Sequence, residues 1–349
     1  AKTAQEESGG NMQNTPAMQL TPGTEFQVAV AKRPAKGLND GTTMIKEAVR
    51  MVHGKPYVVE SKMDGERFTF HKWVGGFRLI SRNSTDYSAG YGVMGRALDA
   101  MLAMIGVEEC ILDGEVLAWD PDKQCYIEFG HNRTAAKKEL NHATGKAPGS
   151  SGNGWVGRRR RDDDSDDSGP EHPPGPLGEE EKVPESASLK YVVFDVLYIY
   201  SRVRAESTGG PVTVALDLLE LGRASAVGGR LMTVSEARDL GSQLSPGSLT
   251  HLPLAVRRGI LEHILIRIRD LPLSEKLTAE DKDRLRMIDH VDMPAPAPGK
   301  PAWSEDRIAD MLMERFVYVT ERGGEGLVVK TYSSKYMLGE SSRYKGEWL

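Results

Sequence analysis

A lysine at the end of an apolar run is the strongest chemical signal in this sequence. Residues 57–60 are typical of a β-strand, and Lys62 follows them, with Asp64, Gly65 and Arg67 close behind. A lysine amine can act as a covalent nucleophile where burial or nearby cations lower its pKa. The Asp-Gly pair predicts a turn that would direct Lys62 into a cleft. The same residues could also form an ordinary hairpin turn with surface charges, so other segments must decide.

Further segments carry the residue types that a nucleotide site needs. Glu115 lies in a predicted strand, and Phe194 precedes an aspartate in the most apolar strand of the chain. Glu325 and Lys330 flank a short apolar run. An aromatic ring suits a base, carboxylates suit ribose hydroxyls and Mg²⁺, and cations suit phosphates. The order lysine, glutamate, aromatic, glutamate, lysine therefore indicates a nucleotide-binding site.

These segments resemble motifs I, III, IIIa and IV of the covalent nucleotidyltransferases. This superfamily comprises the ATP-dependent polynucleotide ligases and the mRNA capping enzymes. Residues 81–83 resemble motif Ia of the ligases, and residues 345–349 resemble the approach to motif V. The sequences of residues 62–67 and 112–119 resemble the end-joining branch of the eukaryotic DNA ligases, that of DNA ligase IV, more than the replicative branch. The resemblance covers roughly residues 25–140, 188–200 and 300–349.

The resemblance implies roles for the residues around motif I. Lys62 would be the nucleophile that forms a Lys–AMP phosphoramidate. Glu60 would lie at the adenine, and Arg67 at the ribose or the phosphate edge. Arg82 would contact a phosphate, although a surface salt bridge is the alternative for this arginine.

The resemblance also implies roles for the later motifs. Glu115 would contact the ribose or help to hold a metal ion, and Glu325 would bind metal. Lys330 would contact the α-phosphate of ATP. Phe194 would stack on the adenine, with plain core packing as the alternative. ATP and Mg²⁺ are thus the expected substrate and cofactor.

The sequence also departs from the family. The gaps on either side of Phe194 are longer than the family's pattern. The motif V lysines would follow Leu349, and we expect the C-terminal OB-fold domain and most of the preceding DNA-binding domain to lie outside this chain. Those lysines would lower the pKa of Lys62, so we expect self-adenylation to need them.

Composition excludes other classes of protein. The 349 residues are 39% hydrophobic, and no run approaches the ~18 apolar residues that cross a bilayer, so no membrane partner is expected. Two cysteines, Cys110 and Cys125, fit no metal spacing and no disulfide framework. The formal net charge of −5 argues against bulk electrostatic binding of nucleic acid, but a local basic groove stays possible.

The pattern of strands and helices predicts an α+β fold, and the resemblance implies that two antiparallel sheets flanked by helices hold the nucleotide between them, as in an ATP-grasp-like adenylation domain. Helices are expected at 43–52, 94–105, 254–266 and 304–321. Strands are expected at 57–60, 68–71, 77–81, 110–119, 191–199, 284–291 and 327–330. Residues 1–24 are expected to be disordered or the tail of a preceding module, and 25–349 to form the adenylation domain.

Residues 141–188 are expected to be a low-complexity insertion. Eight glycines and six prolines fall within 141–190, and an arginine run at 158–161 is followed by five aspartates, so the segment has no means to bury a core. The arginine run could be a nuclear signal or a nucleic-acid patch, but the acidic run beside it favours a solvated loop.

The expected activity is ATP-dependent DNA ligation through a Lys–AMP intermediate, with nicked or broken double-stranded DNA as partner and the nucleus as location. The end-joining likeness implies double-strand-break repair, and a coiled-coil scaffold protein that would dock outside this chain. An mRNA guanylyltransferase shares the Lys-x-Asp-Gly core and is the alternative enzyme. A catalytically silent DNA-binding module is the alternative from a different class.

Overall fold

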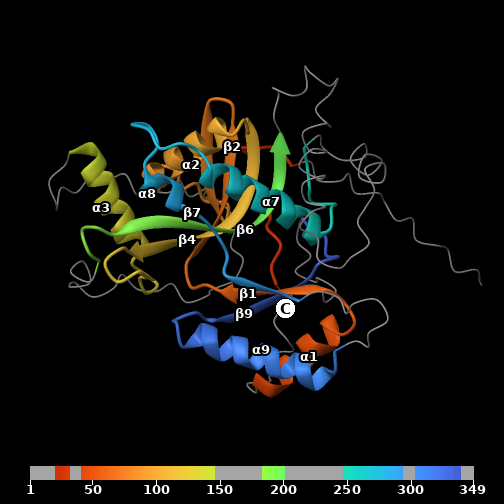
Figure 1. Cartoon of the computed structure of the whole chain (residues 1–349). Helices are drawn as coiled ribbons and strands as arrows, with labels where there is room; N and C mark the ends of the chain where they lie inside the picture. The colour runs from red at the N-terminus through yellow and green to blue at the C-terminus, as the bar shows by residue number, and fades with distance from the viewer. Residues whose placement is uncertain (1–19, 32–40, 146–182, 201–246, 294–302, 339–349) are drawn as a thin grey trace, which may run out of the picture.

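The computed structural model describes residues 20–31, 41–145, 183–200, 247–293 and 303–338 (Figure 1). These residues form two β-sheets with helices packed on them, which confirms the expected mixed α+β fold. Among them, no helix combines the length and the apolar character that crossing a bilayer requires. Residues 345–349, which resemble the approach to motif V, lie outside the described residues.

The larger sheet contains the predicted hairpin and the two longest strands. Its order is β3 (Gly76–Ser81), β2 (Glu66–Trp73), β4 (Glu109–Asp120), β6 (Ser188–Tyr200) and β7 (Leu285–Met287), and β5 (Cys125–Tyr126) pairs with β4. All these pairings are antiparallel except β6 with β7, which is parallel. The expectation of a purely antiparallel sheet is wrong at this point, because the chain returns to β7 through helices, as parallel neighbours require.

The smaller sheet holds the lysine-bearing strand at its centre. Its order is β8 (His290–Met293), β1 (Tyr57–Lys62) and β9 (Gly326–Thr331), and both pairings are antiparallel. Residues 284–291, expected as one strand, in fact divide between β7 in the larger sheet and β8 in the smaller one. The chain therefore crosses from one sheet to the other within a few residues.

Helices cover the outer faces of both sheets. In Figure 1, α1 (Gly41–Val52) and α9 (Glu305–Thr320) lie against the smaller sheet, where Val49, Val59 and Leu312 share one buried cluster. On the larger sheet lie α2 (Gly92–Met104), α3 (Asn132–Thr144), α7 (Leu254–Arg269) and α8 (Ala279–Asp283).

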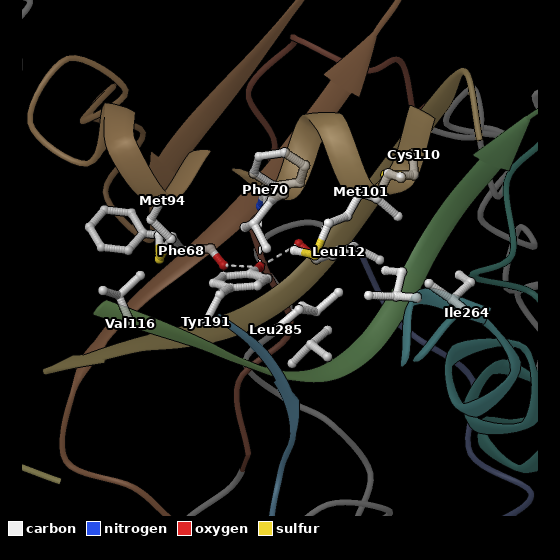
Figure 2. Packing of buried hydrophobic residues seen from close by; sticks show 14 of the residues in the cluster. Phe68, Phe70, Met94, Met101, Cys110, Leu112, Val116, Tyr191, Ile264 and Leu285 are labelled. Atoms are coloured by element: carbon white, nitrogen blue, oxygen red, sulfur yellow. Dashed lines mark hydrogen bonds between the residues drawn. The ribbon is translucent and has the colours of Figure 1, made fainter. Parts of the chain in front are cut away.

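The main core lies between the larger sheet and helices α2 and α7. Figure 2 shows Tyr191 at its centre, where the buried hydroxyl lies 2.9 Å from the carbonyl oxygens of both Phe68 and Leu112 and can donate its proton to either. A buried hydroxyl needs such partners, since an unpaired one is costly. This core fixes β2, β4 and β6 relative to one another, and these strands carry three of the expected site residues.

The ends of two segments predicted to lie outside the core are packed. Leu20 is buried, and the N–H of Gly23 donates to His71 on β2, although both precede residue 25. Residues 141–144 continue α3, and Val183 and Ala187 are buried in the main core. A single leucine or valine among polar residues gives no periodic signal, so the sequence could not show these contacts. The remaining parts, 1–19 and 146–182, lie outside the described residues.

Candidate active site

Alternation along β1 places its charged residues between the two sheets. Tyr57 and Val59 pack against α1 and α9, whereas Val58 packs against α7. Side chains two residues apart share a face of a strand, so Glu60 and Lys62 point the same way as Val58, toward the larger sheet.

Lys62 forms an ion pair with Glu325, the residue just before β9. The backbone N–H of Glu325 also donates to the carbonyl oxygen of Lys62, at 2.9 Å, which fixes the two residues side by side. Both side chains are about half exposed, at 48% and 40%. Lys62 is therefore accessible to a ligand, and a carboxylate stabilises its ammonium form.

Close packing explains why residue 65, three positions after Lys62, is a glycine. Gly65 lies in the turn just before β2, and its N–H donates to Glu115 Oε1 on the neighbouring strand β4 at 3.0 Å. A Cβ at Gly65 would lie 2.6 Å from the carbonyl oxygen of Val116, so a larger residue could not fit. Burial raises the pKa of Glu115 to about 7, against the lowering effects of Gly65, Arg67 and Lys62.

Glu60 is buried between two cations. Its Oε1 accepts from Arg258 Nη1 and its Oε2 from Lys330 Nζ, both at 2.6 Å. Glu60, Arg258 and Lys330 are each at most 3% exposed. A buried carboxylate needs such partners, because a bare charge in the interior is very costly. The expected site residues Glu60 and Lys330 are thus in direct contact.

Phe194 lies between the cations of two strands. Its ring centroid is 4.8 Å from Lys330 Nζ and 5.2 Å from the guanidinium carbon of Arg67. Arg67 donates to both oxygens of the buried Asp113, at 3.0 and 2.6 Å, and Tyr336 Oη donates to Asp113 at 2.6 Å. Phe194 is only half-buried, and it packs against the buried cluster of Leu117, Val192 and Ile288.

Arg82 is not brought to this group. It lies exposed in the turn after β3 and makes none of the ion pairs seen among the described side chains. The structure thus gathers seven of the eight expected residues between the sheets: Glu60, Lys62, Arg67, Glu115, Phe194, Glu325 and Lys330.

Several residues that build the site were missed from the sequence. Arg258 and Arg257 lie on α7, and Arg257 donates to both oxygens of Asp195, at 2.7 and 2.9 Å, directly beside Phe194. Two adjacent arginines flanked by apolar residues, Leu254–Val256 before them and Gly259–Leu261 after them, were the available signal, because apolar neighbours on both sides indicate a buried stretch of helix. Asp113 and Tyr336 carried no signal of their own.

A second polar group supports β1 from its other face. Arg315 Nη2 on α9 donates to Ser61 Oγ at 3.1 Å and pairs with Asp289 at 2.5 Å. Ser61 Oγ also donates to Asp289, at 2.9 Å. These contacts fix the backbone between Glu60 and Lys62.

Comparison with known proteins identifies the family. A model of the ATP-dependent DNA ligase domain matches residues 38–293, more than half of the chain. The chain belongs to the ATP-dependent DNA ligase domain family. This ligase domain also includes structure beyond the match, since β9 pairs with β1 along its whole length.

Individual relatives match only in part. DNA ligase 4 of Arabidopsis thaliana is 36% identical over 113 residues, which cover 32% of this chain and 9% of that protein. DNA ligase 4 of Dictyostelium discoideum is 37% identical over 99 residues, 28% of this chain and 8% of that protein. The matches thus span about a tenth of the length of these relatives.

Solved structures of ligases are similar at low identity. The bacteriophage T7 ATP-dependent DNA ligase in complex with ATP is 12% identical, with a TM-score of 0.42, over 92% of this chain and 67% of that one. Mycobacterial DNA ligase D complexed with ATP and MES is 13% identical, with a TM-score of 0.40, over 93% of this chain and 58% of that one.

Proposed function

We propose that this ligase domain is the adenylation domain of a DNA ligase that acts through a covalent Lys62–AMP intermediate. The observation that carries the proposal is the position of Lys62. It lies accessible at the end of β1, beside Glu325 and on the same strand face as the buried Glu60. A nucleophile at a strand end, surrounded by carboxylates and cations, is the arrangement that nucleotidyl transfer needs.

The proposed first step joins Lys62 to the α-phosphorus of ATP. A P–N bond forms, the P–O bond to pyrophosphate breaks, and pyrophosphate leaves. The amine must lose its proton before it attacks, and the carboxylate of Glu325 is the group in contact with it. Lys330 and Arg67 lie around the Phe194 ring, where they would neutralise phosphate charge while the ring stacks on the adenine.

The carboxylates fit a magnesium ion that arrives with the nucleotide. No cluster of three or more acidic, histidine or cysteine side chains suited to a metal occurs among the residues the structure describes. Magnesium, however, is commonly held by one or two carboxylates together with substrate phosphates. Glu115 and Glu325 both lie near Lys62 and could supply these two. When bound, the ion would stabilise the charge that develops on the phosphates.

The later steps and the cellular role are proposed on the partial likeness to DNA ligase 4. AMP would pass from Lys62 to a DNA 5′-phosphate, and a 3′-hydroxyl would then displace it. End joining of double-strand breaks in the nucleus, with a coiled-coil scaffold partner that binds outside this chain, is the role that this likeness supports.

Labelled nucleotides test the proposal. The chain, and a version extended by any residues that follow Leu349, are each incubated with Mg²⁺ and with either ATP or GTP labelled at the α-phosphate, then denatured and separated. We expect covalent label from ATP only, and none in Lys62→Arg, because a guanidinium stays protonated and is a poor nucleophile. Label from GTP only would favour a capping guanylyltransferase. DNA binding without label from either nucleotide would favour a silent module.

A further inference from the structure

Arg258 is a buried cation whose donors are mostly unused. Its side chain is 2% exposed, and one contact, from Nη1 to Glu60 Oε1, holds it at the site. Its Nε and Nη2 atoms are buried with no hydrogen-bond partner among the described residues. Buried donors without partners are rare and costly, so a residue that keeps them has a reason to be there.

The neighbouring arginine shows what a purely structural arginine looks like in this helix. Arg257 donates to both oxygens of Asp195 and to the carbonyl oxygens of Leu252 and Ser334, at 2.5–3.2 Å. Its guanidinium is thus used on every side. Arg258, one residue later, uses a single nitrogen, and that nitrogen contacts an expected nucleotide-binding residue.

The helix that carries Arg258 is fixed to the strand that carries Lys330. The N–H of Leu254 donates to the Ser334 carbonyl oxygen at 2.7 Å, and the N–H of Ala255 donates to that of Tyr332 at 3.0 Å. Residues 332 and 334 follow β9 directly. Arg258 and Lys330 therefore approach Glu60 from two elements that cannot shift independently.

This geometry dictates how Glu60 can contact a base. Each carboxylate oxygen receives one cation, which fixes the orientation of the group. A charged carboxylate only accepts hydrogen bonds. It can accept from the amino group at C6 of adenine, whereas the carbonyl oxygen at C6 of guanine would be repelled.

We propose that Arg258 is a positioning residue that sets the preference for ATP over GTP by holding Glu60 as a fixed acceptor. The inference rests on the proposed nucleotide site and extends it to a residue on α7. A lysine would not replace this arginine, because its ammonium is a strongly hydrated point charge on a flexible stem and would hold Glu60 less rigidly.

Calorimetric binding of ATP and of GTP to the full chain tests the proposal. In Arg258→Lys we expect ATP binding to weaken about tenfold or more, as for loss of a hydrogen bond to a charged group, with GTP binding unchanged. The matched control is Arg284→Lys, because Arg284 also forms a buried pair with a glutamate, Glu139, at 2.7 Å, away from Lys62. The control should keep the wild-type ratio of the two affinities.

A second pair of variants shows whether Arg258 acts through Glu60, and Arg258→Gln takes the place of Arg258→Lys throughout if the lysine variant does not fold. Glu60→Gln should lose the preference for ATP, and Glu60→Gln/Arg258→Lys should lose no more, because the residue that Arg258 positions is already changed. Losses that add up, or an unchanged affinity ratio in Arg258→Lys, would overturn the inference. A wild-type chain that binds neither nucleotide would instead overturn the proposed function, and the inference with it.

Discussion

At the scale of single residues, the site is a set of ion pairs formed by the groups expected to bind the nucleotide. Lys62 pairs with Glu325, Glu60 with Lys330, and Arg67 with Asp113. Each cation thus has a carboxylate partner before any phosphate arrives. A bound nucleotide must compete with these contacts or add to them, so the partner carboxylates influence binding as much as the cations do.

Glu115 makes the stability of the domain depend on pH. Burial raises its pKa from 4.5 to about 7, so the fold favours the protonated carboxyl. This contribution to stability is fully present below pH 4.5 and is lost as the pH rises through about 7. In Glu115→Gln the fall in stability between about pH 5 and about pH 8 should be smaller than in the wild type. Urea unfolding measures both curves, and identical pH profiles would show that the carboxyl does not titrate here.

A substitution at Phe194 distinguishes between two roles of the ring, stacking on the base and packing in the core. The ring is half-buried and lies beside Lys330 and Arg67, so a leucine should keep the fold while ATP binding weakens by roughly 0.5–1.5 kcal/mol, the usual worth of an aromatic contact. Phe68→Leu, in the main core, is the control and should lower stability without a specific effect on binding. Wild-type affinity for ATP in folded Phe194→Leu would assign the ring to the core.

At the scale of elements, the sequence predicted what hydrophobic periodicity encodes. Strands β1, β2, β3, β4, β6 and β9 and helices α1, α2, α7 and α9 lie where their patterns placed them, within a few residues. Helix α3 was missed because it is polar and buries only Asn132, Ala135 and Ala136. The division of residues 284–291 between two sheets was missed because strand partners are chosen by the fold and leave no local pattern.

The same dependence on local sequence patterns explains which residues of the site could be predicted. Lys62, Glu115 and Phe194 were predicted because they sit in motifs within or at the end of apolar strands. Arg258 was missed because its role depends on where α7 packs, more than 190 residues along the chain from its partner Glu60. Arg82 was predicted at the site on resemblance alone, and the turn after β3 leaves it exposed.

His71 links the segment before α1 to the larger sheet and should make that contact sensitive to acid. Burial lowers its pKa from 6.5 to about 3, and its Nδ1 accepts from the N–H of Gly23 at 3.1 Å, which a protonated ring cannot do. Its contribution to stability is fully present above pH 6.5 and is lost as the pH falls toward 3.

In His71→Gln, stability should therefore be lower near neutral pH and should change less on acidification than in the wild type. Urea unfolding across that range is the measurement, and His53→Gln, at an exposed position, is the control that should follow the wild type. An acid profile in His71→Gln as steep as that of the wild type would show that other groups cause the loss.

At the scale of the whole molecule, two sheets carry complementary parts of one site. The smaller sheet supplies Lys62 and Lys330, and the larger one supplies Arg67, Glu115 and Phe194. Helix α7 contacts both parts, through Arg257 to Asp195 and through Arg258 to Glu60. Changes that loosen α7 should thus affect the whole site at once.

The predicted insertion gives a test of where the domain ends. Lys138 Nζ on α3 donates to the Val183 carbonyl oxygen at 2.7 Å, so the chain on either side of residues 146–182 is held together. Deleting 146–182 should leave the melting temperature nearly unchanged, because its composition cannot bury a core. Deleting 146–187 should lower it, because Val183 and Ala187 are lost from the core. An equal, large drop in both would show that 146–182 packs on the domain.

The measurement that tests the central claim most directly is the mass of the chain after incubation with ATP and Mg²⁺, followed by peptide mapping. It is made on this chain and on a version extended by any residues that follow Leu349. The account predicts one AMP, attached to Lys62, with none in Lys62→Arg and an unchanged adduct in Lys55→Arg, a control at an exposed lysine nearby. An adduct on another residue, one that survives Lys62→Arg, or none in either version, would contradict it.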